Sequence, residues 1–446
     1  MIVDRIVIGG GFAGLLSSVR AAQRGEKVEL IERSHRLGGA LRSARVGGFD
    51  LDCGAEAFST IDPSGVNLLE ELGISSLLEI PRSNAPVILT ESGKIPIPRG
   101  VLGIPADLRE VYSSGAISKQ SYSDALIRDS KPLPEDWHSL GIRTLVSKRL
   151  GQELFNQVVA PILTSVYGPH SINCSFAEIM PSFASAIRAE GSLVGAAAKL
   201  RGNSSSTGSA VGSLRGGLHT MVDFLVQKAR SLGVQITTGA DEISISKLSK
   251  AWCVESETDK LRTERLTIAC GPVESEKLLS KLDGGETNSR GQKQRSTRIV
   301  LALVEDESLD EFPIGSGAIV SDQVDPAIRA TSHINAKWQW VQDLLEPRQH
   351  LVRFSCSRPI SGQNPTVESR ISDALTLICG SRPEKILDIE MTSWPSHLVE
   401  TYPGFQEKNK SLIKRGQKLG VDLAGSSVSG NGLLGIIQNI NNWRES

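Results

Sequence analysis

Short apolar runs alternate with helically spaced apolar positions from the start of the chain. Ile6–Ile8 predicts a buried strand, and Leu15, Leu16 and Val19 recur at the spacing of a helix face. Val28–Ile31 then predicts a second buried strand. The order strand, helix, strand within about 30 residues predicts a βαβ unit with parallel strands.

A glycine-rich turn connects the first strand to the helix. Gly9, Gly11 and Gly14 match the spacing GxGxxG, in which the glycines give a tight turn, close approach of a ligand and close helix packing. The free N–H groups at the helix start favour a diphosphate. Glu32 ends the second strand about 20 residues later, where a carboxylate accepts hydrogen bonds from ribose hydroxyls. The glycines alone are a weak signal, but the complete unit predicts a dinucleotide site.

Composition limits the other functions open to the chain. Its length of 446 residues predicts two or more domains. The 49 basic and 50 acidic residues leave no surplus of positive charge that would favour nucleic-acid binding. The six scattered cysteines form no CxxC pair, so neither a metal site nor a redox dithiol is expected. No signal peptide precedes the first strand, and no apolar run approaches the ~20 residues that cross a bilayer. We expect a cytoplasmic protein, at most peripheral on the inner face of the membrane.

The segment after Glu32 narrows the type of dinucleotide. Glu32 is followed by a short loop, by the pair Gly38-Gly39 and then by Arg42 and Ser43. This pattern resembles the flavoprotein family of amine oxidases, phytoene desaturases and protoporphyrinogen oxidases, in which the second glycine pair lies beside FAD. The resemblance implies non-covalently bound FAD rather than NAD.

Two later segments fit the same family. Gly216-Gly217 opens an amphipathic helix that precedes three predicted strands, and backbone near Glu242 would meet the adenine. Near the C-terminus the strand Val421–Leu423 leads into a glycine loop that opens a helix, whose N–H groups would face the flavin. The nucleotide fold is therefore expected to be discontinuous.

Further segments resemble the porphyrinogen oxidases, and above all the actinobacterial coproporphyrinogen III oxidases. They cover most of the chain and include Asp50–Phe58, Ile95–Gly100, Val158–Pro161, Ser213–Leu218 and Lys337–Trp340. The resemblance implies oxidation of coproporphyrinogen III to coproporphyrin III in haem biosynthesis, with molecular oxygen as acceptor and hydrogen peroxide as product. Hydride passes from a methylene bridge to flavin N5, so positioning and a dry pocket matter more than a general base, and no catalytic side chain is expected.

The expected site residues fall into two groups. Those expected to bind FAD come from five parts of the chain: Gly9, Gly10, Gly11, Phe12, Ala13, Gly14, Glu32, Arg33, Gly39, Ala40, Gly54, Ala55, Glu56, Ala57, Glu242, Ser426, Asn431, Gly432 and Leu433. Candidates for the propionates are Lys94, Lys337, His333 and Arg99, since Val87 stands where many relatives have an arginine.

The expected architecture is α/β plus α. A discontinuous Rossmann-like FAD domain (1–62, 208–285, 405–446) accompanies a mixed-sheet substrate domain (63–104, 188–207, 286–404). Residues 105–187 are expected to form a helical lobe, which in relatives walls the substrate cavity and can touch the membrane. Within it, Ser175 and Glu178 have the spacing of a capping box at the start of a helix. Residues 299–400 are expected to hold short strands, and 202–212 and 283–298 are expected to be connections.

Alternatives remain open from the sequence. They are a protoporphyrinogen IX oxidase, a flavin amine oxidase, a phytoene-type desaturase and a non-catalytic FAD-containing binding protein. The glycine motifs indicate that a nucleotide binds, but they do not show that the protein catalyses a reaction. Nothing in the residues distinguishes a substrate with four propionates from one with two. The sequence does not determine an oligomeric state.

Overall fold

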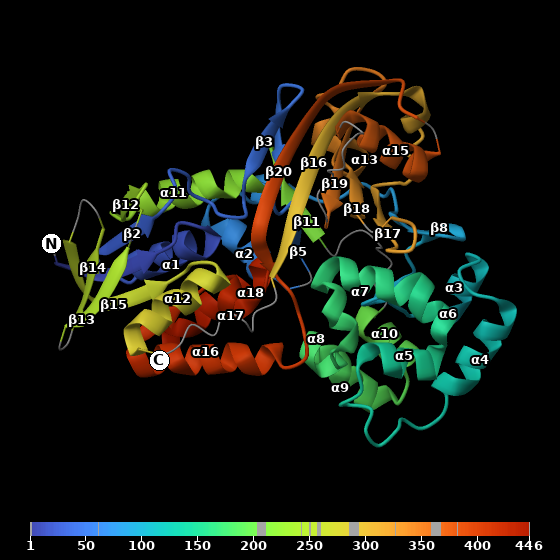
Figure 1. Ribbon diagram of the computed structural model, residues 1–446, viewed down its shortest axis with the longest axis horizontal. Helices are drawn as coiled ribbons and strands as arrows, with labels where there is room; N and C mark the ends of the chain where they lie inside the picture. Colours follow the sequence, from blue (N-terminus) through green and yellow to red (C-terminus); the bar gives the residue numbers. More distant parts are fainter. Residues whose placement is uncertain are drawn as a thin grey trace.

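The computed structural model describes residues 2–60, 62–202, 211–241, 243–248, 251–256, 260–284, 294–325, 327–357, 367–380 and 382–445. Two mixed sheets and a helical lobe make up most of these residues (Figure 1). The α/β architecture predicted from the sequence is confirmed.

The first sheet contains the N-terminal βαβ unit. Its path is β12 (Gln235–Thr238), β2 (Val28–Glu32), β1 (Ile2–Ile8), β15 (Lys260–Ile268), β14 (Ala251–Glu255) and β13 (Ser244–Leu248), with β21 (Val421–Leu423) also on β15. Strands β12, β2, β1, β15 and β21 run parallel, whereas β14 and β13 are antiparallel. The parallel part therefore joins segments from the start, middle and end of the chain.

Helices cover both faces of this sheet, because successive side chains of a strand point to opposite sides. Val7 packs with α1 (Phe12–Gln23), α11 (Met221–Ser231) and α18 (Leu433–Asn441). Ile6 and Ile8 pack on the other face with α12 (Pro272–Asp283) and α16 (Phe405–Leu419). The result is a three-layer unit, on the left of Figure 1.

The second sheet lies beside the first. Its order is β20 (Lys385–Val399), β16 (Gln294–Glu305), β19 (Gln349–Cys356), β18 (Ile328–His333), β17 (Gly317–Val320), β7 (Val87–Thr90) and β8 (Gly93–Pro96). Only β17 and β7 pair in parallel among these strands. Helix α15 (Val367–Cys379) packs on one face, and α13 (Ile334–Lys337) and the hairpin β3 (Ser43–Val46)–β4 (Phe49–Asp52) pack on the other.

The expectation of short strands in 299–400 holds for β17 and β18 but was wrong for β16 and β20. Strand β16 has 12 residues and β20 has 15, and β16 begins inside the expected connection 283–298. Polar residues interrupt the apolar pattern of both strands, but the two strands pair along almost their whole length and so extend each other. Residues 203–210 and 285–293 of the expected connections lie outside the described part.

The helical lobe lies at the lower right of Figure 1. It contains α3 (Leu108–Ser113), α4 (Lys119–Asp129), α5 (Ile142–Leu150), α6 (Gln152–Leu154), a π-helical turn (Phe155–Val159), α7 (Ala160–Tyr167), α8 (Phe176–Ile179), α9 (Pro181–Glu190) and α10 (Leu193–Arg201). Phe155, Phe176 and Phe183 are buried in its core. The predicted capping box is present, since Ser175 and Glu178 cap the first turn of α8 reciprocally. Among the described residues no helix is long and apolar enough to cross a membrane.

Smaller elements connect these units. They are β5 (Phe58–Ser59), α2 (Ser64–Glu71), β6 (Leu78–Glu79), β9 (Gly100–Val101), β10 (Ile104–Pro105), β11 (Val211–Leu214), α14 (Gln339–Gln342) and α17 (Ser426–Ser429), with 3₁₀ turns at Ser75–Leu77, Pro169–Asn173, Leu218–Thr220, Glu307–Leu309 and Asn442–Glu445.

Candidate functional site

The turn between β1 and α1 is built as a nucleotide turn requires. Gly11 is the N-cap of α1, and no side chain caps the first turn. Gly9 has a φ of +108°, and a Cβ on Gly14 would lie 1.7 Å from the Gly9 carbonyl oxygen. A side chain at Gly14 is therefore sterically excluded, and the start of α1 lies directly against the turn.

The second glycine pair lies beside this turn. The Gly38 N–H donates to the Gly10 carbonyl at 2.8 Å, and Gly11 and Gly38 form an isolated parallel bridge. A Cβ on Gly11 would be 3.7 Å from the Gly39 Cα, while Gly39 and Ala40 are exposed. The uncapped helix start thus lies against the backbone of the second glycine pair, and this cradle fits a diphosphate.

Glu32 lies at the end of β2, as predicted. Its carboxylate accepts hydrogen bonds from the Gly10 N–H at 2.5 Å and the Ser34 N–H at 2.8 Å. It therefore holds the glycine turn, and the remaining lone pairs of its oxygens can still accept ribose hydroxyls. Arg33 is exposed, and Phe12 is buried in the core, so only the backbone of Phe12 can serve a ligand.

The segment Cys53–Ala57 adjoins the second glycine pair. The Ala55 N–H donates to the Ala40 carbonyl at 3.0 Å, and a Cβ on Gly54 would lie 1.9 Å from that same oxygen. Side chains of the second sheet hold the segment from the other side. Trp394 Nε1 donates to the Cys53 carbonyl at 2.7 Å, and Arg353 donates to the Gly54 carbonyl at 2.8 Å.

Glu56 is the most highly connected carboxylate of the site. Oε1 accepts from Lys337 Nζ at 2.9 Å and Trp338 Nε1 at 3.0 Å, and Oε2 accepts from the Ser332 hydroxyl at 2.9 Å. Burial would raise the pKa of Glu56, but the charges of Lys337 and Arg353 and these hydrogen bonds lower it to about 2. Its carboxylate is therefore ionised at neutral pH.

The C-terminal loop completes the arrangement. The site of a Cβ on Gly425 is 3.3 Å from the Ala13 Cβ, so the loop reaches the first turn of α1. Gly432 is the N-cap of α18, and Ser426 and Leu433 are half-buried. The Asn431 side chain binds the backbone of Val399. Its expected FAD contact, like those of the other residues of this loop, stays a prediction.

The remaining expected residues are Glu242 and the four candidates for the propionates. Glu242 lies outside the described residues. Lys94 is exposed, and its Nζ donates to the Pro313 carbonyl at 3.2 Å, while Arg99 forms a 3.8 Å ion pair with Glu110. His333 is fully buried, with Nε2 3.1 Å from His350 Nδ1, and presents no surface to a propionate. Lys337 forms an ion pair with Glu56. The structure does not bring these four candidates together.

Sequence reasoning missed Ser332 and Arg353. Ser332 binds the Glu56 side chain, and Arg353 binds the Gly54 backbone. Their partners lie 276 and 299 residues away in the chain, so no local pattern could have indicated them.

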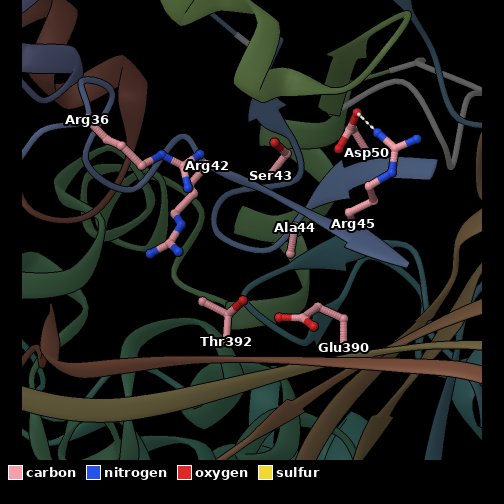
Figure 2. Close-up of a pocket in the computed structure, with 8 residues that line it drawn as sticks. All are labelled: Arg36, Arg42, Ser43, Ala44, Arg45, Asp50, Glu390 and Thr392. Carbon is pink, nitrogen blue, oxygen red and sulfur yellow. Dashed lines mark hydrogen bonds and ion pairs between the residues drawn. The ribbon is translucent and has the colours of Figure 1, made fainter. Parts of the chain in front are cut away.

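A basic hollow lies at the β3–β4 hairpin, close to the second glycine pair in the sequence (Figure 2). Arg36, Arg42 and Arg45 line it with Asp50 and Glu390, together with Ser43, Ala44 and Thr392. Arg45 is 3.4 Å from Asp50, and the Arg42 guanidinium lies 5.8 Å from the centre of the Trp394 ring. Three cations against two carboxylates favour an anion at this edge of the hairpin.

Comparisons with known proteins agree with the site. Residues 7–72 match the model of the NAD(P)-binding Rossmann-like domain. Coproporphyrinogen III oxidase of Mycobacterium tuberculosis is 25% identical over 437 residues, covering 96% of this chain and 93% of that protein. Coproporphyrinogen III oxidase of Bacillus subtilis is 22% identical, covering 96% and 94%. The chain resembles the porphyrinogen oxidases.

Solved structures of similar proteins have the same fold as this chain. A protein assigned as a protoporphyrinogen oxidase from Exiguobacterium has a TM-score of 0.83 at 22% identity, with 99% of this chain and 97% of that chain covered. Putrescine oxidase has a TM-score of 0.65 at 16% identity, with 99% and 97% covered. This is the fold of the FAD-dependent oxidases, and FAD is the cofactor that agrees with the fold and with the cradle. The comparisons support an oxidoreductase.

Proposed function

We propose that the chain oxidises coproporphyrinogen III to coproporphyrin III in haem biosynthesis, with molecular oxygen as acceptor and hydrogen peroxide as product. The observation that carries the proposal is similarity over 96% of the chain to proteins named coproporphyrinogen III oxidase. A plant protoporphyrinogen oxidase from Arabidopsis thaliana matches only 49% of the chain, at 27% identity. This difference in coverage favours coproporphyrinogen over protoporphyrinogen.

The reaction suits a site without acid–base side chains. A porphyrinogen bridge carbon gives up hydride readily, because the adjoining pyrroles stabilise the resulting cation. When bound, FAD supplies the N5 atom that accepts this hydride and is then reoxidised by oxygen. The protein has to position the two partners and exclude water.

The described residues can perform these tasks. We assign the FAD diphosphate to the cradle of the Gly9–Gly14 turn and the Gly38–Gly39 pair, and the ribose to Glu32. The Cys53–Ala57 segment is held by side chains of the second sheet on one side and by the Ala40 carbonyl on the other, so its backbone is a rigid wall. Gly430–Leu433 follows β21 and is tied to the end of β20 through Asn431 and Val399. We propose that its N–H groups face the bound flavin.

The division into an FAD domain, a substrate domain and a helical lobe is part of the same proposal. The helices of the lobe share a buried core, which also includes residues of α10 and Ile88, Ile95 and Ile104, outside 105–187. Peripheral contact of the lobe with a membrane surface remains a proposal.

Purified FAD-loaded protein should be mixed in air with freshly reduced coproporphyrinogen III and, separately, with protoporphyrinogen IX. We expect rapid porphyrin fluorescence and peroxide with the first substrate, and a slower rise with the second. The Gly11→Val variant is the flavin-free control for autoxidation. A faster reaction with protoporphyrinogen would reassign the substrate, whereas no reaction above the control with either would reject porphyrinogen oxidation. Peroxide formed from putrescine would then indicate an amine oxidase.

A further inference from the structure

A small group of buried charges joins the predicted flavin segment to the second sheet. Glu56 belongs to the Cys53–Ala57 segment, Lys337 ends α13 and Arg353 lies in β19. Their side chains are only 11%, 17% and 14% exposed. We refer to Glu56, Lys337 and Arg353 as the charge cluster.

The charge cluster is not electrically balanced. Lys337 Nζ is 2.9 Å from Glu56 Oε1, and a terminal nitrogen of Arg353 is 3.7 Å from Oε2. One carboxylate thus faces two cations, which leaves a net charge of +1. Arg353 Nε is buried and has no hydrogen-bond partner among the described residues. Such an excess is costly in a poorly solvated place unless it interacts with something of opposite sign.

The cluster also fixes the backbone that leads to the cradle. Arg353 donates to the Gly54 carbonyl at 2.8 Å, and Ser213 donates to the Glu56 carbonyl at 2.9 Å. Between these points the Ala55 N–H bonds to Ala40. Gly54 and Ala55 therefore cannot shift without breaking contacts to the cluster.

Reduced flavin is more negative than oxidised flavin, so a nearby fixed positive charge stabilises the reduced form. We propose that Glu56, Lys337 and Arg353 position the Gly54–Ala55 backbone against FAD and raise the reduction potential of the flavin through their net positive charge. This inference rests on the FAD part of the proposed function and not on the substrate. The Glu56 carboxylate is then a positioning group rather than an FAD ligand, since its oxygens are already bound by protein donors.

The test compares two substitutions that change charge in opposite directions. Glu56→Gln raises the cluster charge to +2, and Lys337→Gln lowers it to zero. We expect the midpoint potential of bound FAD, measured by equilibration with redox dyes, to rise in E56Q and to fall in K337Q. Lys199→Gln is the matched control, because Lys199 forms a 2.6 Å pair with Glu190 at the surface of the lobe.

A structural role alone would weaken FAD binding in both variants without opposite shifts. Potentials that stay at the wild-type value, or move in the same direction, would overturn the inference. Arg353→Lys retains the charge but loses the fork of donors, so it should weaken FAD binding and leave the potential near that of the wild type. If E56Q does not retain FAD, the contrast between K337Q and R353K decides the question. Opposite shifts in a protein that oxidises no porphyrinogen would support the cluster and reject only the substrate.

Discussion

Asn431 and Val399 are joined by two hydrogen bonds between the last glycine loop and the end of β20. Asn431 Oδ1 accepts from the Val399 N–H at 3.0 Å, and Nδ2 donates to the Val399 carbonyl at 2.7 Å. Val399 is 3% exposed whereas Asn431 is exposed, so the Asn431 side chain covers the Val399 backbone from the solvent side. The Asn431 side-chain amide pairs with the N–H and C=O groups of Val399, as the backbone of a neighbouring strand would. It therefore fixes the loop that precedes α18.

Replacing Asn431 should loosen this loop. In Asn431→Ala both backbone groups of Val399 lose their partner, which costs about 1–3 kcal/mol. We expect a lower free energy of unfolding in urea and weaker binding of FAD in titrations followed by flavin fluorescence. Asn67→Ala, on the exposed face of α2, is the control. Unchanged FAD affinity in N431A would argue against placing this loop at the flavin.

Two glycines of the first turn should respond differently to a side chain. A Cβ on Gly11 meets nothing closer than 3.7 Å, whereas a Cβ on Gly14 would lie 1.7 Å from the Gly9 oxygen. We expect Gly11→Val to fold, with wild-type circular dichroism, but to purify without yellow colour because its side chain fills the cradle. Gly14→Val should fail to fold. A fully flavin-loaded G11V protein would contradict our placement of the diphosphate.

The helical lobe depends on one buried ion pair. Arg149 Nε is 3.1 Å from Asp129 Oδ1, and the guanidinium also donates to four backbone carbonyls, among them that of Gly191. Asp129 in turn accepts from the first N–H groups of α10. Arg149→Met should cost about 3–5 kcal/mol, because it leaves a buried carboxylate uncompensated. Limited proteolysis should then cut within the lobe, while cleavage elsewhere first would contradict the local effect. Arg188→Met is a suitable control.

The buried His333 predicts a pH dependence of stability. Burial, and secondarily the neighbouring His350, lowers the pKa of His333 to about 3. Below about pH 6.5 the unfolded chain binds a proton here that the native state excludes, so stability should fall by about 1.4 kcal/mol per pH unit. This loss continues as the pH falls toward about 3. His333→Gln should flatten the pH dependence by that slope between pH values of about 6.5 and 5, measured by urea denaturation.

His138→Gln removes an exposed imidazole and serves as the comparison for H333Q. An H333Q protein with the slope of the wild type would mean that His333 binds its proton in the native state.

The sequence predicted the nucleotide unit well because its signals are local. Predicted strands at Ile6–Ile8 and Val28–Ile31 lie within β1 and β2, and the glycines lie at the turn that their spacing indicated. Gly9 and Gly14 have their roles for steric reasons that act within a few residues. The same holds for the Ser175 capping box.

The contacts that hold the site could not be predicted in this way. Trp394 binds Cys53 across 341 residues of sequence, and Arg353 binds Gly54 across 299. Both contacts depend on the register of the second sheet against the hairpin β3–β4, and register is set by packing rather than by local pattern. From the sequence Lys337 is a candidate for the substrate propionates, and no local pattern indicates that the fold supplies Glu56 as its partner.

Strand β21 pairs with β15, and its following glycine reaches Ala13 in the first turn of α1. The Gly9–Gly14 turn leaves the ribosome first. It cannot be completed by its C-terminal neighbours until Val421–Leu423 has been synthesised, more than 400 residues later. Until then Leu266–Ile268 of β15, which lie beyond its pairing with β14, form an open parallel edge that is able to pair wrongly. Cofactor capture should thus follow synthesis rather than accompany it, and a chain cut short by premature termination would be both colourless and prone to aggregate.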